Sequence, residues 1–206
     1  MKIDNSKVYD LEESIIASGF PMQTGHDQNL FALKANALTE HVYGTKNTYT
    51  YSDIRRVIKL ASNPSGSGHC NFLSGILVAT NITATNVWWL QFERYHFAQI
   101  VSMQSKMHRL KQMLETNFVC NDKTDRNSIK RCKELLESGA DDETVVYACP
   151  MGIELTARIT TNYLQLKTIY NQRKNHKLHE WHTFCEWVET LPLANELITG
   201  KFLGKE

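Results

Sequence analysis

The sequence has no long apolar run and no excess of charge of one sign. Its 206 residues carry 23 Lys and Arg against 22 Asp and Glu, a formal net charge of +1. A near-neutral chain lacks the positive potential that binds nucleic acid polymers, so we expect an anionic ligand to be small and held by a local cluster of cations. No stretch resembles a signal peptide or a membrane span. We therefore expect a soluble, cytoplasmic protein with no nucleic acid polymer and no membrane among its partners.

The sequence also lacks a cysteine pairing pattern. The five cysteines are an odd number without a close pairing pattern, which argues against a disulfide scaffold and suits a reducing compartment. The apolar fraction of 42% is ample for a packed core, so disorder of the whole chain is excluded. At this length we expect a single domain spanning residues 1–206.

Helical spacing is clearest in residues 52–61, where Ser52 is the expected N-cap and the stop is Asn63-Pro64. The apolar positions of this helix follow the spacing i, i+3, i+4, i+7: Ile54, Val57, Ile58 and Ala61. An earlier helix is predicted at residues 10–18, with Asp10 and Glu13 in a capping-box arrangement. Residues 23–51 are weakly patterned and are predicted to be irregular, apart from a short helix at 30–38.

Alternating β-branched residues predict a strand at 76–83, followed by a helix at 86–93 capped by Thr85 or Asn86. Polar residues dominate 102–109, which we interpret as a functional loop. The remaining predicted elements are a charged helix at 127–138 that ends at Gly139, a short strand at 144–149, and helices at 155–174 and 178–190. Helices outnumber strands and do not alternate regularly with them, so the predicted class is α+β.

One polar cluster lies at and beyond the end of the helix at 86–93. Within sixteen residues it holds three permanent cations, two histidines and two serines. Phosphates need charge-assisted donors, and a pyrimidine edge needs both donors and acceptors, so the cluster suits a nucleotide. The alternative is a solvated basic helix end. The residues are Arg94, Tyr95, His96, Ser102, Gln104, Ser105, Lys106, His108 and Arg109.

A second polar stripe is predicted on the helix that begins near residue 155. On a helical wheel it lies beside an apolar stripe, which indicates a cleft wall, whereas the alternative is the ordinary boundary of an amphipathic helix. The polar stripe consists of Arg158, Asn162, Gln165, Arg173 and His176. The apolar stripe consists of Ile159, Tyr163, Leu166 and Tyr170.

Three other features have simpler interpretations. Cys149, before Pro150, has no catalytic partner nearby and is interpreted as a structural thiol. Residues 65–68 are rich in glycine but lack the lysine of a phosphate-binding loop, so they are interpreted as a connector that leads to His69. The third feature is a set of histidines spaced by three residues: His176, His179 and His182. No cysteine or carboxylate completes a zinc site around them, so no metal is expected.

Taken in order, these pieces resemble the flavin-dependent thymidylate synthase family. That family carries a histidine ahead of a strand, a turn of small residues, and a helix ending in Arg-His-Arg with a serine shortly after. Here His69 precedes the strand, Thr83-Ala84-Thr85 forms the turn, and the helix runs without a gap to Arg94-Tyr95-His96. The resemblance covers residues 69–189. Its downstream matches are Pro150, Asn162 and Asn171-Gln172-Arg173.

The chain departs from the family at the motif itself. Of the family's Arg-His-Arg only Arg94 is kept. The motif serine falls on Gln104 by strict count, and on Ser105 if one residue is inserted. The family's later Asn-Ala-Arg is Asn162-Tyr163-Leu164 here, so an arginine is missing at that point, and Arg158 is the candidate substitute.

The resemblance implies an α+β fold with a central, mostly antiparallel sheet flanked by long helices. It also implies an enzyme that binds FAD and transfers a one-carbon unit from methylenetetrahydrofolate to C5 of dUMP, giving dTMP, with NADPH as the second co-substrate. The family forms homotetramers, and we expect the same assembly. The alternatives are a flavin-dependent dUMP hydroxymethylase that makes a modified pyrimidine nucleotide, and a non-catalytic flavin- or nucleotide-binding paralogue.

The resemblance also assigns residues to the two ligands. Cofactor binding is expected of His69, Arg94, His96, Asn162, Asn171 and Arg173. Nucleotide binding is expected of Gln104, Ser105, His108, Arg109 and Arg158. The residues predicted to be catalytic are Ser105, Arg109 and Arg158.

Overall fold

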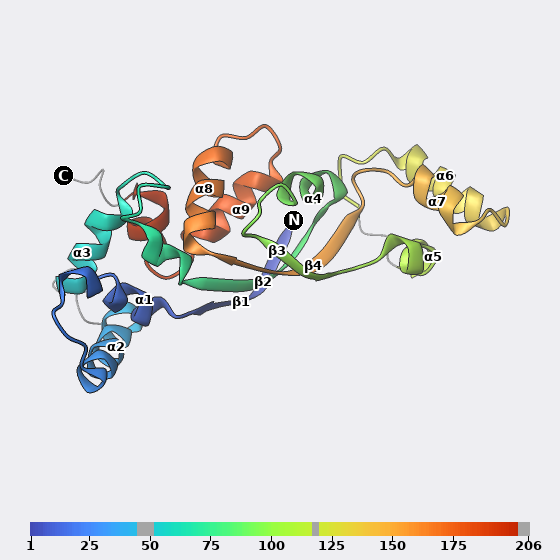
Figure 1. The fold of residues 1–206 in the computed structure, drawn as a ribbon. Helices are drawn as coiled ribbons and strands as arrows, with labels where there is room; N and C mark the ends of the chain where they lie inside the picture. The colour runs from blue at the N-terminus through green and yellow to red at the C-terminus, as the bar shows by residue number, and fades with distance from the viewer. Residues whose placement is uncertain (45–51, 117–119, 202–206) are drawn as a thin grey trace. The chain divides into compact units, whose positions relative to one another are not determined.

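A computed structural model describes residues 1–44, 52–116 and 120–201 (Figure 1). The elements in chain order are β1 (Lys2–Tyr9), α1 (Leu11–Ala17), η1 (Phe20–Met22), α2 (Gln28–Tyr43), α3 (Ser52–Ala61), η3 (Asn71–Ser74), β2 (Leu77–Thr85), α4 (Asn86–Phe92), β3 (Gln99–Met103), α5 (Lys106–Thr116), α6 (Arg126–Glu137), α7 (Asp142–Ala148), β4 (Glu154–Asn162), α8 (Tyr163–Arg173), α9 (Glu180–Glu189) and the π-helical η4 (Asn195–Thr199).

The strands of the described chain form one antiparallel sheet in the order β1-β2-β4-β3. Thr83 of β2 lies opposite Thr156 of β4, with 2.8 Å between their hydroxyl oxygens. In β4, burial alternates from one residue to the next, so Leu155, Ala157 and Ile159 are buried while their neighbours reach solvent. This alternation gives the sheet one apolar and one polar face. The predicted α+β class with an antiparallel sheet is confirmed.

The described residues gather into two compact units. Unit 1 consists of residues 1–5 and 80–159, and unit 2 consists of residues 6–79 and 160–206. β1, β2 and β4 each contribute residues to both. A single domain spanning residues 1–206 stays a prediction.

In unit 1, α4 packs its aromatic side chains against β4. The Trp89 Nε1 donates a hydrogen bond to the Leu155 carbonyl at 3.0 Å, and the rings of Trp88 and Phe92 stack at 4.8 Å. All three aromatic side chains are buried. The Thr85 hydroxyl accepts a hydrogen bond from the Trp88 N–H at 3.3 Å, so the predicted helix and its threonine cap are confirmed.

Unit 1 also contains a small helical core made by α5, α6 and α7 around Cys132 and Val145. The predicted helix at 127–138 is confirmed as α6, and Gly139 follows it with a φ of 77°. The predicted strand at 144–149 is wrong, because these residues lie mostly in α7. Asp141 caps α7 by accepting the Thr144 N–H at 2.7 Å. This cap and an acidic first turn outweigh the β propensity of the two valines.

In unit 2, the predicted helices at 10–18 and 52–61 are confirmed as α1 and α3. The predicted capping box is wrong, because Asp10 has a φ of 59° and its carboxylate accepts the Ser14 hydroxyl at 2.8 Å instead of a backbone N–H. The short helix predicted at 30–38 is confirmed, but it is longer than expected, because residues 28–43 form α2. Asp27 caps this helix by accepting the N–H groups of two residues in its first turn. Residues 23–27 and residue 44 are irregular as predicted, and residues 45–51 lie outside the described residues.

Two further expectations fail around the sheet. The predicted helix at 155–174 is β4 up to Asn162 and a helix only from Tyr163 onward. Ile159 and Tyr163 fit helical spacing by coincidence. The predicted loop at 102–109 is too long, because only residues 104 and 105 lie between β3 and α5. No clear sequence pattern had indicated β1. No helix among the described residues is long and apolar enough to cross a membrane.

Candidate functional site

The Arg94-Tyr95-His96 motif forms the turn that follows α4. Tyr95 is only 8% exposed, and its ring meets the ring of Phe92 edge-on at 6.5 Å. Arg94 and His96, on either side, are exposed, and within the described residues neither engages a hydrogen bond or an ion pair. A buried tyrosine therefore anchors a turn that presents a guanidinium and an imidazole to solvent. Such a donor pair fits an anionic group such as the pyrophosphate of a dinucleotide.

Gln104 and Ser105 join β3 to α5, and both are held by the backbone. Gln104 pairs with Thr156 of β4 twice: its N–H donates to the carbonyl at 3.0 Å, and its Oε1 accepts the N–H at 2.9 Å. The Ser105 hydroxyl accepts the His108 N–H at 3.4 Å, and its carbonyl accepts the Arg109 N–H at 3.1 Å. Gln104, Ser105, His108 and Arg109 thus lie at the start of α5, where the helix dipole favours anions.

A cavity of about 160 Å³ lies beside this helix start. Its polar lining comes from Lys106, His108 and Lys111, with Asp142 of α7 as a counter-charge. The volume suits one small anionic group and is too small for a whole nucleotide. The sequence placed Lys106 in the polar cluster but assigned it no role. In the sequence, only its position beside Ser105 indicated that Lys106 could bind a ligand. Its place in the cavity follows from the packing of α5 against α7.

Arg158 lies on the polar face of the sheet and not on a helix. The predicted stripe that joined it to Asn162 and Arg173 is therefore wrong. Its Nη1 donates to the Asn5 carbonyl at 2.9 Å and to the Asn81 Oδ1 at 3.1 Å. No hydrogen bond in the described part of the chain engages its Nε or Nη2, so these groups remain able to bind an anion.

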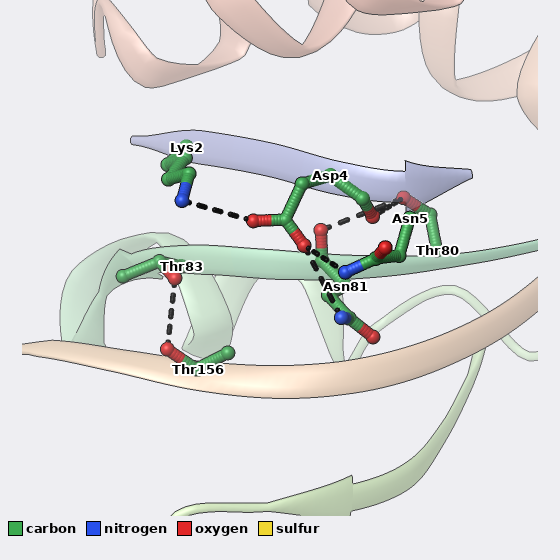
Figure 2. A network of polar contacts seen from close by, with 7 residues as sticks. All are labelled: Lys2, Asp4, Asn5, Thr80, Asn81, Thr83 and Thr156. Carbon is green, nitrogen blue, oxygen red and sulfur yellow. Dashed lines mark hydrogen bonds and ion pairs between the residues drawn. The ribbon is translucent and has the colours of Figure 1, made fainter.

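The residues that hold Arg158 belong to a polar network across β1 and β2 (Figure 2). The Asn81 amide donates to the Asp4 carboxylate at 3.2 Å, and the Lys2 ammonium lies 3.2 Å from the same carboxylate. The hydrogen bonds from Lys2 and Asn81 lower the pKa of Asp4 from its ordinary value. Asn5 has a φ of 52°, which asparagine tolerates better than most residues. Arg158 is thus positioned by a pre-formed set of polar contacts.

Unit 2 holds the other predicted flavin residues. His69 is exposed in the loop after α3, and Asn171 is exposed on α8. The Asn162 Oδ1 accepts the Gln165 N–H at 2.8 Å, so this side chain already serves as the N-cap of α8. Its amide N–H groups remain for a ligand.

Arg173 ends α8 and is oriented by an aromatic ring. Its guanidinium carbon lies 4.7 Å from the centroid of the Trp181 ring. Trp181 is fully buried, and no sequence pattern had indicated its contact with Arg173. In the turn between them, the His176 Nδ1 accepts the Leu178 N–H at 3.0 Å, and the His182 Nε2 donates to the His176 carbonyl at 2.7 Å. Burial, Arg173 and His182 all lower the pKa of His176.

These histidines do not form a metal site in the structure. No group of three or more metal-binding side chains occurs within residues 1–44, 52–116 and 120–201. The five cysteines are all free thiols. Burial raises the pKa of Cys149 to about 12 and the pKa values of Cys120 and Cys185 to about 11, so these thiols stay protonated near neutral pH.

The predicted ligand residues are divided between the two units. Unit 1 holds Arg94, His96, Gln104, Ser105, His108, Arg109 and Arg158, and unit 2 holds His69, Asn162, Asn171 and Arg173. Within unit 1, the structure groups Gln104, Ser105, His108 and Arg109 at the start of α5. Within unit 2, Asn162, Asn171 and Arg173 share α8 or its cap.

No protein-family model matches the sequence, and no curated protein matches it. Solved structures do match. The flavin-dependent thymidylate synthase ThyX from Helicobacter pylori, complexed with FAD and dUMP, superposes with a TM-score of 0.70 at 14% identity, covering 96% of this chain and 97% of that one. A second structure of ThyX from Helicobacter pylori with FAD and dUMP has a TM-score of 0.70 at 13% identity and the same coverage.

The UMP/dUMP methylase PolB from Streptomyces cacaoi, bound with 5-Br dUMP, has a TM-score of 0.61 at 12% identity, covering 97% of this chain and 95% of that one. At such identities the likeness concerns the fold. The chain therefore has the fold of the flavin-dependent thymidylate synthases.

Proposed function

We propose that this protein transfers a one-carbon unit from methylenetetrahydrofolate to C5 of dUMP, giving dTMP, with FAD as cofactor and NADPH as reductant. The observation that carries the proposal is the agreement between fold and motif order. The fold matches ThyX over 96% of the chain, and the matching stretch carries His69, Arg94 and Arg173 in the family's order.

In each unit taken by itself, the residues that the resemblance assigns to the flavin have the chemistry that a flavin dinucleotide needs. Bound FAD supplies the redox chemistry of the transfer, and the protein supplies binding and orientation. Arg94 and His96 offer unengaged donors for the pyrophosphate, and Arg173 is held in place by Trp181. Asn171 and the amide of Asn162 add neutral donors for a ring edge.

The nucleotide residues have complementary chemistry. The start of α5 combines the positive end of the helix dipole with the side chains of Lys106, His108 and Arg109, which suits a phosphate. Ser105 and Gln104 lie next to this helix start and supply hydroxyl and amide groups. Arg158 offers its remaining guanidinium donors from the polar sheet face, where it stabilises charge on the pyrimidine or phosphate.

A hydroxymethylase is the second candidate. It is favoured by His96, an exposed imidazole where the family has an arginine, because losing a permanent cation changes how an intermediate and nearby water are held. In that case water, and not hydride, completes the reaction.

Assembly as a homotetramer forms part of the proposal. Unit 1 exposes large apolar side chains at Phe97 (70% exposed), Val101 (60%) and Leu90 (54%). Val101 lies on β3, an edge strand of the sheet. An exposed edge strand that carries a large apolar side chain is typical of surfaces that subunits cover. Light scattering coupled to gel filtration measures the subunit number directly.

The deciding experiment supplies the protein with FAD, dUMP, methylenetetrahydrofolate and NADPH and identifies the nucleotide by mass spectrometry. dTMP supports the proposal, and hydroxymethyl-dUMP supports the second candidate. Unchanged dUMP, in the presence of a bound and reducible flavin, rejects both and leaves a non-catalytic binding paralogue.

A further inference from the structure

Lys167 is a buried lysine on α8 whose ammonium group lies at the C-terminal end of α3. Lys167 is 8% exposed. Its Nζ donates hydrogen bonds to the carbonyls of Ala61 and Asn63, the latter at 2.6 Å. Burial lowers the pKa of Lys167, and the neighbouring Cys70 acts in the opposite direction. A lysine head group is rarely buried unless it is hydrogen-bonded, so these two contacts explain its position.

The end of α3 needs such a partner because the last carbonyls of a helix have no donor within the helix. Local groups satisfy some of them. The Ser62 hydroxyl donates to the Lys59 carbonyl at 2.7 Å, and the Asn63 N–H donates to the Leu60 carbonyl at 3.3 Å. The carbonyls of Ala61 and Asn63 are instead reached by Lys167, which is distant in sequence.

The same segment continues into the loop that presents His69. The Pro64 carbonyl accepts the Ser67 N–H at 3.2 Å and the Cys70 thiol at 3.6 Å, and Cys70 is fully buried. Between these contacts the loop is exposed, and its two glycines, at 66 and 68, have φ values of 95° and 81°. The loop is therefore tied down at its base by Lys167 on one side and by Cys70 on the other.

We propose that Lys167 is a positioning residue that fixes the base of the loop of residues 62–70 and thereby sets the place of His69 for flavin binding. The second half of this statement rests on the proposed function, which assigns His69 to the flavin. The first half concerns the contacts of unit 2 alone. Lys167 acts through the carbonyls of Ala61 and Asn63 and does not itself touch the ligand.

The first test measures how fast iodoacetamide alkylates Cys70, with the site identified by peptide mass. Lys167→Met has nearly the same side-chain volume and is one atom shorter, but it leaves two carbonyls without a donor. We expect alkylation of Cys70 about tenfold faster in this variant, because the loop opens more often. Lys59→Met, an exposed lysine on the same end of α3, is the matched control and should react within about twofold of wild type.

A wild-type alkylation rate in Lys167→Met overturns the proposal. If that variant does not fold, Lys167→Gln takes its place, since the shorter amide keeps a polar group but cannot reach both carbonyls. A several-fold faster rate is then expected, and a wild-type rate again rejects the anchor.

The second test is a double-mutant cycle for FAD affinity with His69→Ala and Lys167→Met, measured by flavin fluorescence well below the melting temperatures. Each single variant should bind FAD about tenfold more weakly, and the double variant no more weakly than His69→Ala. Additive losses, or full affinity in Lys167→Met, overturn the positioning role, because a merely structural residue would not depend on His69. Failure of wild type to bind FAD rejects the proposed function, while Cys70 alkylation still decides whether Lys167 anchors the loop.

Discussion

The guanidinium of Arg173 lies 4.7 Å from the centre of the Trp181 ring, so an indole buried in unit 2 orients a cation at the end of α8. The contact depends on the planar shape of the guanidinium, which stacks on aromatic faces. A residue assigned to the flavin is therefore supported by a core residue.

Replacing Arg173 with lysine tests this support. An ammonium group at this position would keep the charge but lose the planar stack, so we expect Arg173→Lys to bind FAD about fivefold more weakly with little change in melting temperature. Isothermal titration calorimetry measures the affinity. Lys174→Arg, at the next position, is the control and should bind like wild type. Equal affinities for wild type and Arg173→Lys would show that stacking does not matter for the flavin.

The turn at His176 makes stability depend on pH. Because the folded-state pKa of His176 lies below its ordinary value of 6.5, the unfolded chain binds more protons between these two values. The contribution of His176 to the free energy of unfolding is therefore complete above pH 6.5 and is lost as the pH falls through its folded-state pKa. Protonation also places a hydrogen on the Nδ1 that accepts the Leu178 N–H.

Thermal unfolding from roughly pH 5 to 8 measures this effect. In His176→Asn the Oδ1 occupies the place of Nδ1 and accepts the same bond without titrating. The melting temperature of the variant should fall less than that of wild type on acidification. Parallel curves would exclude His176 as the titrating group.

Arg109 and Arg158 are predicted to bind the nucleotide phosphate. Their different contacts in the structure predict different effects on stability when each is replaced by alanine. Removing one partner of a desolvated arginine–phosphate pair costs about 2–5 kcal/mol, so the correct Arg→Ala variant should bind dUMP at least about tenfold more weakly with FAD still bound. Within the described residues the Arg109 side chain hydrogen-bonds only to the Gln112 Oε1, at 2.8 Å, so Arg109→Ala should keep its stability. Arg158→Ala also frees the Asn5 carbonyl and should melt earlier.

Equilibrium dialysis with dUMP, alongside thermal unfolding, distinguishes these effects. Arg131→Ala, an exposed arginine on α6, serves as the control. Wild-type dUMP affinity in both Arg109→Ala and Arg158→Ala would mean that neither arginine holds the phosphate.

Cys149 is predicted to take no part in the reaction as a thiolate. With a pKa of about 12, Cys149 has a thiolate fraction well under about one in a thousand at pH 8. We therefore expect Cys149→Ser to retain nearly all one-carbon transfer, and native Cys149 to react very slowly with a thiol reagent. Loss of turnover in a folded Cys149→Ser, judged by nucleotide analysis and circular dichroism, would contradict this assignment.

The sequence by itself determined the elements whose signals are local. α3 follows from apolar spacing that needs no knowledge of its neighbours, and α4 follows from Thr85 and the aromatic residues after it. Gly139 marked the end of α6 because a positive φ suits glycine. The order and spacing of several short matches between His69 and Arg173 predicted the fold through the family resemblance.

Only the tertiary structure decided features that depend on residues far apart in the chain. Residues 155–162 have both helical and alternating spacing, and pairing with β2, more than 70 residues earlier, selects the strand. That choice moved Arg158 from a helix to the polar sheet face. Lys167 has no local pattern at all, because the carbonyls that it caps lie about a hundred residues before it. Long-range strand pairing and the burial of a charged side chain depend on tertiary packing, which a short stretch of sequence does not determine.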